Sequence, residues 1–121
     1  MKIQESAENY LETILVLSQK QEHVRSIDVV NELQLSKPSV SVAMKNLRTN
    51  GYININSEGH ITLTEEGLKI ATDIYERHSL FTDWLVKLGV DPIIAQNDAC
   101  KMEHAISPES FEAIKKHVNK K

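Results

Sequence analysis

The sequence contains a single cysteine, Cys100, and no apolar segment long enough to cross a membrane. One cysteine cannot form an internal disulfide, which excludes a disulfide-stabilised secreted scaffold, and one free thiol is typical of the reducing cytosol. The longest uninterrupted aliphatic run, residues 14–17, is far shorter than the roughly 20 residues of a transmembrane helix. Residues 1–5 lack the apolar core of a secretion signal. We therefore expect a cytoplasmic protein without a membrane partner.

The sequence also lacks an excess of positive charge. Its 14 Lys and Arg residues stand against 17 Asp and Glu residues, which gives a formal net charge of −3. A protein that coats nucleic acid without selectivity is normally basic overall. Any contact with DNA must therefore come from a local surface, or must follow the neutralisation of acidic groups. A length of 121 residues leaves room for one compact core or two small ones, which excludes a large multidomain enzyme.

Helical periodicity dominates the first part of the chain. Apolar residues spaced by three and four positions predict three helices, over residues 6–20, 26–33 and 37–49. Ser26 is the predicted N-cap of the second helix, because its hydroxyl can accept a hydrogen bond from a free backbone N–H. Pro38 lies in the first turn of the third helix, where its missing N–H costs nothing.

The apolar period then changes from 3.6 to 2. Residues 52–55 and 60–63 alternate polar and apolar side chains around a turn that contains Gly59, a pattern that predicts a β-hairpin. Three helices followed by a hairpin with such short loops are typical of a winged helix-turn-helix. We assign this DNA-binding domain to residues 1–70.

The rest of the chain is predicted to be helical throughout. Three further helices are expected over residues 64–88, 92–105 and 108–116. The predicted fold class is therefore mainly α, with the N-terminal winged helix-turn-helix followed by an all-helical domain over residues 71–121.

The exposed face of the third helix is the predicted DNA-contacting surface. It mixes one cation with hydroxyls, an amide and small apolar groups, which suits phosphates and base edges in a major groove. The residues predicted to contact DNA are Lys37, Pro38, Ser39, Ser41, Val42, Lys45, Asn46, Arg48 and, near the hairpin tip, His60. The alternative is an ordinary solvated helix face with one exposed valine.

A cluster of metal-ligand side chains lies in the helical half. Cys100, Glu103 and His104 stand at i, i+3 and i+4, so all three project from one helical face. A thiolate, a carboxylate and an imidazole together suit a divalent transition metal better than Ca²⁺ or Mg²⁺. The alternative is that a single cysteine is a small buried hydrophobe and that the three residues lie together by chance.

Two other helices carry polar residues that need partners. His78 lies in an apolar stripe of the long helix, and Asn9 and Glu12 form a second stripe on the first helix. The alternatives are a hydrogen-bonded core histidine and a solvated glutamate.

Together, these features resemble the diphtheria-toxin-repressor family of metal-dependent bacterial transcription regulators, which includes iron and manganese sensors. The most specific segments are SAENYLE at residues 6–12, SKPSVS at 36–41 and NDACKMEH at 97–104, with Arg77-His78 on the long helix. The resemblance implies metal ligands at Glu12, His78, Cys100, Glu103 and His104. Asn9 stands where manganese sensors typically have an aspartate and iron sensors a methionine, and as a neutral amide it is a weaker donor.

The resemblance also bears on the metal and on the form of the chain. Cys100 matches the iron-sensing branch, whereas manganese sensors usually carry glutamate there, and a soft thiolate favours Fe²⁺, Co²⁺, Ni²⁺ or Zn²⁺ over Mn²⁺. Thr82 and Gln96 replace two ligands of the ancillary site of iron sensors, so one site is expected. Val42 replaces a recognition-helix glutamine, which implies a different operator. The chain resembles the short form without an SH3-like domain.

The predicted function is metal-dependent repression of metal-uptake genes, with Fe²⁺ as the expected effector. A metal held by the first, fourth and fifth helices would join the two halves and fix the spacing of two recognition helices on a pseudo-palindromic operator. Homodimerisation is expected from the wide apolar arc at the end of the long helix and just after it, although these residues could instead pack on the last two helices. The arc consists of Leu80, Phe81, Trp84, Leu85, Leu88, Ile93 and Ile94.

Three alternatives remain open at this point. One is a manganese-responsive regulator of the same family. Another is a winged-helix regulator that senses oxidants through Cys100. The third, an enzyme with Cys100 and His104 as nucleophile and base, is disfavoured because no oxyanion loop or cofactor motif accompanies them.

Overall fold

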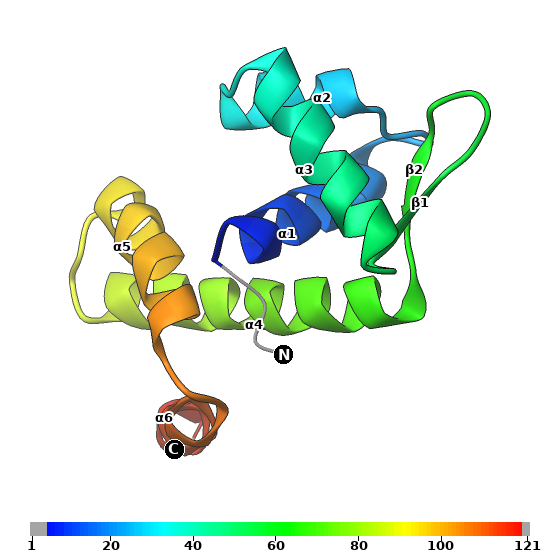
Figure 1. Ribbon diagram of the computed structural model, residues 1–121. Helices are drawn as coiled ribbons and strands as arrows, with labels where there is room; N and C mark the ends of the chain where they lie inside the picture. The colour runs from blue at the N-terminus through cyan, green and yellow to red at the C-terminus, as the bar shows by residue number, and fades with distance from the viewer. Residues whose placement is uncertain (1–4, 120–121) are drawn as a thin grey trace. The chain divides into compact units, whose positions relative to one another are not determined.

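The computed structural model describes residues 5–119 and is mainly helical, with one two-stranded sheet (Figure 1). The elements in chain order are α1 (Glu5–Lys20), α2 (Ser26–Leu33), α3 (Lys37–Thr49), β1 (Ile53–Ile55), β2 (Ile61–Leu63), α4 (Glu65–Lys87), α5 (Pro92–Ala105) and α6 (Pro108–Asn119). This order confirms the predicted fold class. No helix in the described part of the chain is both long and apolar enough to span a membrane.

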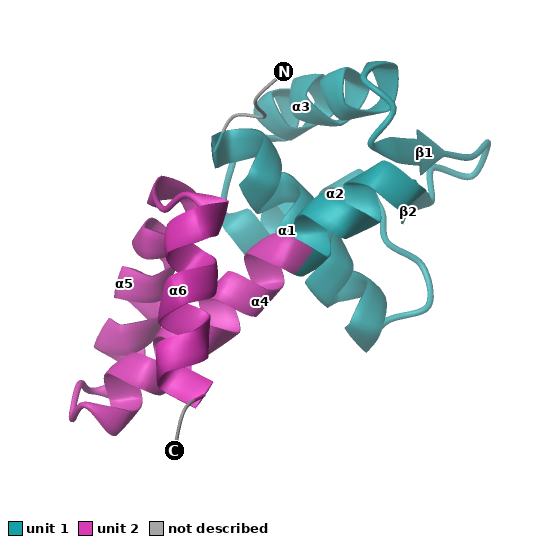
Figure 2. Ribbon diagram, turned by 90° about the horizontal axis from the view of Figure 1, so that it is seen from below, with its two compact units in different colours: residues 1–72 teal, residues 73–121 magenta. Residues whose placement is uncertain are grey.

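The chain divides into two compact units, coloured separately in Figure 2. Unit 1 comprises Met1–Thr72 and unit 2 comprises Asp73–Lys121, so α4 contributes its first turns to unit 1 and the rest to unit 2. The boundary expected between residues 70 and 71 falls in the same turn of α4.

Unit 1 is built around one apolar cluster. Helices α1 to α3 and the sheet all contribute to it, because each presents an apolar face at its own period. Its buried members are Leu11, Ile14, Leu17, Val24, Val29, Val40, Met44, Leu47, Ile53, Ile61 and Ala71. The result is the winged helix-turn-helix arrangement of three helices and a hairpin.

The hairpin is attached to the segment between α1 and α2. Strands β1 and β2 are antiparallel, with Ile55 opposite Ile61. The backbone N–H of Ile61 also donates to the Val24 carbonyl at 2.7 Å, and the two residues form an isolated bridge. The wing is therefore fixed to the α1–α2 linker by backbone pairing, a contact that the sequence pattern did not predict.

Local sequence signals set most of the element ends. The Ser36 hydroxyl accepts from the Ser39 N–H at 3.2 Å at the start of α3, and Thr64 Oγ1 accepts from the Gly67 N–H at 3.1 Å at the start of α4. Gly67 has to be a glycine, because a Cβ there would collide with the Tyr52 carbonyl.

The predicted N-cap of α2 is wrong. Arg25, not Ser26, occupies this position, with extended backbone angles. Its N–H donates to the Asp28 carboxylate at 2.8 Å, so the side chain three residues ahead caps the chain from inside the helix.

Unit 2 has a much smaller apolar centre. Phe81, Ala99 and Phe111 are buried there, and the two phenyl rings meet edge to face with centroids 5.7 Å apart. Asp91 is the N-cap of helix α5, and its carboxylate accepts from the Ile93 N–H at 3.0 Å.

Candidate functional site

Three metal-ligand side chains come together in unit 2. His78 on α4 and Cys100 and Glu103 on α5 each offer a ligand atom, and these atoms all lie within 4.8 Å of one another. Cys100 and Glu103 are one helical turn apart, so the packing of α5 on α4 is what brings the imidazole to the thiol and the carboxylate.

Glu103 is the centre of this cluster. Its side chain is fully buried, and its Oε2 lies 2.9 Å from Nδ1 of His78. Its Oε1 lies 3.2 Å from Nε2 of His104 but accepts no hydrogen bond within the described residues. A buried carboxylate oxygen without a hydrogen bond is costly unless a cation or a proton compensates it. The carboxylate is thus flanked by two imidazoles from different helices.

Arg77 holds the end of α5 in place. Its Nη1 donates to the carbonyls of Glu103 at 3.1 Å and Ile106 at 2.9 Å, and its guanidinium lies 5.3 Å from the centre of the Phe111 ring. The last carbonyls of a helix lack intrahelical donors, and a guanidinium satisfies two of them here. The sequence pattern does not predict this role of Arg77, because its partners are backbone atoms of another helix.

The donor set fits a divalent transition metal. Thiolate sulfur, imidazole nitrogen and carboxylate oxygen are together borderline ligands that suit Fe²⁺, Co²⁺, Ni²⁺ and Zn²⁺. The carboxylate oxygen that lacks a hydrogen bond agrees with such an ion, because a cation would compensate the buried charge. Without a metal, the same residues would form a histidine–carboxylate hydrogen-bond network.

The two remaining candidate ligands lie on α1 in unit 1. Asn9 and Glu12 are one helical turn apart and both are half-buried. Their participation in the metal site stays a prediction from the family resemblance.

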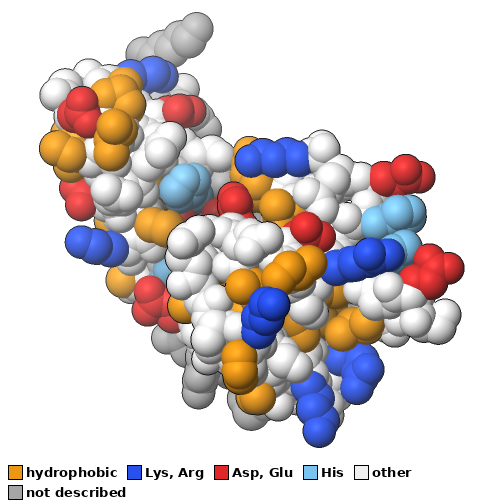
Figure 3. Space-filling view, turned by 90° about the horizontal axis from the view of Figure 1, so that it is seen from above, with side chains coloured by type: hydrophobic (Ala, Val, Ile, Leu, Met, Phe, Trp, Pro, Cys, Tyr) orange, Lys and Arg blue, Asp and Glu red, His pale blue; other side chains and the backbone are white. Residues whose placement is uncertain are grey.

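The predicted DNA-contacting residues of α3 all face solvent. The eight residues from Lys37 to Arg48 named above are exposed, and Val42 is 61% exposed, whereas Val40, Met44 and Leu47 are buried on the opposite face. Figure 3 shows Lys and Arg side chains among apolar and acidic ones over this region, rather than one continuous basic patch. Because the chain has a formal net charge of −3, contact with DNA requires a local surface of this kind.

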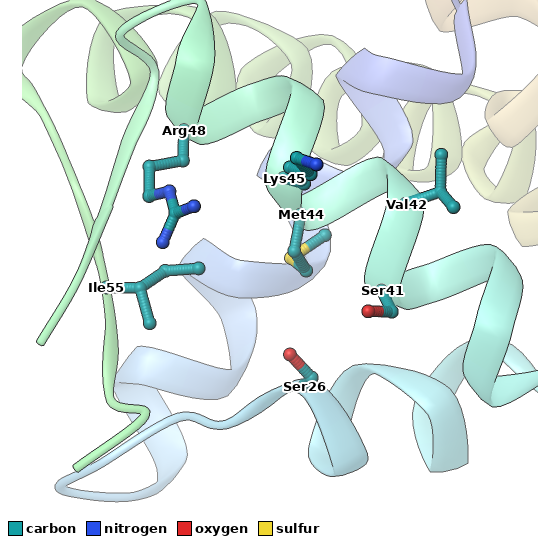
Figure 4. Close-up of a pocket in the computed structure, with 7 residues that line it drawn as sticks. All are labelled: Ser26, Ser41, Val42, Met44, Lys45, Arg48 and Ile55. Atoms are coloured by element: carbon teal, nitrogen blue, oxygen red, sulfur yellow. The ribbon is translucent and has the colours of Figure 1, made fainter. Parts of the chain in front are cut away.

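A cleft of about 290 Å³ lies between α3, the start of α2 and β1. Its lining combines Lys45 and Arg48 with the hydroxyls of Ser26 and Ser41. In Figure 4, the Arg48 guanidinium and both hydroxyls point into the cleft, while Val42 points away from it. Cations and hydroxyls around an open cleft are groups that bind phosphate oxygens.

His60 differs from the other predicted DNA contacts. Its side chain is only 11% exposed, and its ring stacks on that of His23 with centroids 4.1 Å apart. Its Nε2 lies 3.0 Å from Nη2 of Arg25. The structure thus gives His60 partners within unit 1.

The predicted apolar arc of unit 2 separates into two groups. Phe81 is fully buried within the unit, and Leu80 and Trp84 pack partly against the same centre. By contrast, Leu88, Ile93 and Ile94 at the α4–α5 connection are 66%, 71% and 54% exposed. Leu85 is half-buried, so the second group is the most exposed part of the arc.

Comparison with protein families gives two adjacent matches that together span almost the whole chain. Residues 2–61 match the N-terminal DNA-binding domain of the iron-dependent repressors. Residues 64–120 match their metal-binding and dimerisation domain.

Individual relatives agree. The chain is 35% identical to the transcriptional regulator MntR of Escherichia coli O157:H7 over 116 residues, 96% of this chain and 75% of that protein. It is 34% identical over 118 residues to an uncharacterised helix-turn-helix regulator of Methanocaldococcus jannaschii, covering 96% of this chain and 94% of that one. The solved structure of the manganese regulator SloR superposes with a TM-score of 0.83 at 25% identity over 98% of this chain. The chain spans about half of that solved protein, 55% of its length.

Proposed function

Because the chain belongs to the iron-dependent repressor family of metal-dependent transcription regulators, we propose that it represses metal-uptake genes when a divalent metal binds at His78, Cys100 and Glu103. DNA binding, metal binding and dimerisation come with family membership. The chain is accordingly a regulator and not an enzyme, and we place its action in the cytoplasm, where the DNA is.

The observation that carries this proposal is the convergence of His78 and Cys100 on the buried carboxylate of Glu103. When bound, the metal supplies positive charge to a group that is expensive to bury as an anion. His104, beside Glu103 Oε1, completes the set from unit 2. Glu12 enters as a ligand from unit 1, with Asn9 as a weaker donor, through the family resemblance.

Fe²⁺ is the proposed effector. A thiolate ligand raises the affinity for Fe²⁺ and later transition metals relative to Mn²⁺, which prefers oxygen ligands. Manganese is the second candidate, because the solved relative SloR is described as a manganese regulator. As a ligand, Cys100 would therefore favour Fe²⁺ over Mn²⁺.

On DNA, α3 is the proposed recognition helix. Its exposed residues would enter the major groove, and the cleft that holds Lys45 and Arg48 would face the backbone. A homodimer joined through Leu88, Ile93 and Ile94 would present two such helices to a pseudo-palindromic operator, with half-sites separated by about 34 Å. Metal binding would favour the arrangement that fits this spacing.

Anaerobic DNA binding with different metals tests the function. Duplexes of about 30 base pairs, enriched from a random pool by the metal-loaded protein, accommodate two half-sites one helical turn apart. At fixed salt, we expect tight binding with Fe²⁺ and weak binding after chelation, because a switch requires the ion to favour one state by a few kcal/mol. Equal affinity with and without every metal would contradict the proposal. Loss of binding on peroxide treatment of metal-free protein would favour the oxidant-sensing alternative.

Two substitutions of Cys100 test the choice of metal. Cys100→Ser should weaken Fe²⁺ and Zn²⁺ binding more than Mn²⁺ binding, because it removes the only sulfur ligand. Cys100→Glu should raise the Mn²⁺ response relative to wild type. If Cys100→Ser leaves the metal dependence of DNA binding unchanged, Cys100 is not a ligand.

The proposed contribution of Glu12 has its own control. Glu12→Gln should reduce metal affinity, whereas Glu32→Gln on the exposed surface of α2 should not. Equal metal affinities of the two variants would remove Glu12 from the ligand set and leave the three donors of unit 2.

A further inference from the structure

A pair of stacked histidines joins the wing to the α1–α2 linker. The rings of His23 and His60 lie nearly parallel, at an angle of 7°, with centroids 4.1 Å apart. The backbone bridge between Val24 and Ile61 lies directly beside this stack, because both of its residues adjoin the histidines in sequence. The stack on His23 and the adjacent Val24–Ile61 backbone bridge therefore both hold the His60 ring in position.

The His60 ring makes a hydrogen bond to a guanidinium. Nη2 of Arg25 lies 3.0 Å from Nε2 of His60, and since a guanidinium only donates, His60 Nε2 accepts and carries no proton. The remaining proton of a neutral ring is on Nδ1, which lies 3.6 Å from a carboxylate oxygen of Glu58. Nη2 of Arg25 is thus held by an acceptor that carries no negative charge.

Arg25 stands at the edge of the DNA-reading surface. It is exposed and immediately precedes Ser26, whose hydroxyl lines the cleft with Lys45 and Arg48. In a helix-turn-helix, the helix before the recognition helix crosses the DNA backbone, and Arg25 is the N-cap of that helix here. A guanidinium in this place can bind a phosphate through two parallel N–H groups.

We propose that Arg25 contacts a backbone phosphate of bound DNA and that His60, stacked on His23, is the positioning residue that aims it. This inference rests on the proposed recognition of DNA by unit 1. It changes the role predicted for His60 from a DNA contact to a support for one. The sequence predicted neither Arg25 nor its link to the wing, since the partners are 35 positions apart.

Arg25→Ala tests the phosphate contact in the full-length, metal-loaded protein on the enriched duplex. We expect weaker binding to all sequences by a similar factor, and a salt dependence reduced by about one unit of slope per protomer. Lys45→Ala is the reference variant from α3. If Lys45→Ala weakens binding and Arg25→Ala does not, this inference fails while the proposed function stands. If neither affects binding, the proposed DNA surface itself is wrong.

Substitutions of His60 test the positioning role. His60→Phe keeps a ring for His23 but removes the acceptor, so affinity should fall about fivefold at pH 8. His60→Gln offers an amide oxygen to Arg25 and should stay within about twofold of wild type at the same pH. Metal saturation is checked for each protein, so that a change in DNA affinity does not reflect a change in metal loading.

The double variant Arg25→Ala/His60→Phe tests whether His60 affects DNA binding through Arg25. If His60 acts through Arg25, the double variant should bind no more weakly than Arg25→Ala alone. Additive losses would show that His60 contacts DNA independently and would overturn the positioning role. A loss of affinity in His60→Gln as large as that in His60→Phe would also overturn it, because only the first variant keeps an acceptor for Arg25.

Discussion

The two units of this chain use their interiors differently. The buried cluster of unit 1 is entirely apolar and draws on every one of its helices and both strands. The buried cluster of unit 2 is centred on Phe81, Ala99 and Phe111, and Glu103 is the one charged residue that is buried in the described part of the chain. Unit 1 therefore carries its functional groups on its surface, whereas unit 2 carries a functional group inside.

The two units are therefore stabilised by different forces. Apolar burial contributes about 25 cal/mol per Å² and needs no metal ion, so the core of unit 1 should form without metal. A buried carboxylate is tolerated only with compensating charge or hydrogen bonds, so unit 2 should gain stability from a bound cation.

The largest effect is expected from a cavity in unit 1. Leu11→Ala removes a fully buried side chain from the larger cluster and should lower the free energy of unfolding by about 2–5 kcal/mol. Thermal unfolding followed by circular dichroism measures this loss, with Ile27→Ala, a half-exposed residue of α2, as the control. The rise in melting temperature on adding metal should be kept in the variant. Its disappearance would mean that metal binding depends on an intact unit 1.

Glu103→Gln should have the next largest effect. The substitution keeps the shape of the side chain but removes the charge, so metal affinity should fall by about 100-fold or more, as measured by calorimetric titration. The metal-free variant should be as stable as wild type or more stable, because a buried charge has been removed. Glu109→Gln on exposed α6 should change neither quantity. A metal-free variant much less stable than wild type would show that the carboxylate stabilises unit 2 by itself.

Arg77→Ala should have a moderate effect on unit 2. It removes two hydrogen bonds to carbonyls at the end of α5 and the contact over Phe111, at a cost of about 1–3 kcal/mol in stability. Metal affinity should fall about tenfold, because Glu103 loses its support. The control is Lys101→Ala, which removes an exposed cation of α5. A loss of stability without any loss of metal affinity would limit Arg77 to a structural role.

The smallest effect is expected on the surface of unit 2. The Glu76 carboxylate accepts a hydrogen bond from Lys115 at 2.9 Å, and this contact raises the pKa of Lys115 above its ordinary value of 10.5. The pair therefore contributes below pH 10.5 and is lost as the pH rises through the raised pKa. Because the pair is exposed, Glu76→Gln should lower the pKa of Lys115 in an NMR titration without a clear change in melting temperature at pH 7.

Most of the fold could be predicted because its signals are local. The change of apolar period after α3 predicted the wing, and Gly51 and Gly89, both with positive φ, lie where helices were expected to end. The predicted N-cap of α2 was wrong because the Asp28 carboxylate accepts from the N–H of Arg25 and makes Arg25 the N-cap. The presence of a hydroxyl at Ser26 does not exclude this alternative start of the helix. The strands are each one residue shorter than predicted at their first residue.

The candidate site could be predicted only where it is local. The spacing of Cys100 and Glu103 along one helix is visible in the sequence, but their approach to His78 depends on how α5 packs on α4. Arg77 and Arg25 could not be found in this way, because one binds backbone carbonyls and the other a histidine that becomes adjacent only on folding. Contacts between segments far apart in the sequence leave no periodic pattern from which they could be predicted.

The position of Trp84 makes the two interiors distinguishable in solution. It is the only tryptophan in the chain, and it packs against the Phe81 cluster of unit 2. Its fluorescence therefore reports on the surroundings of the proposed metal site. A shift of that emission during a titration with metal would follow ion capture in unit 2 without an attached dye.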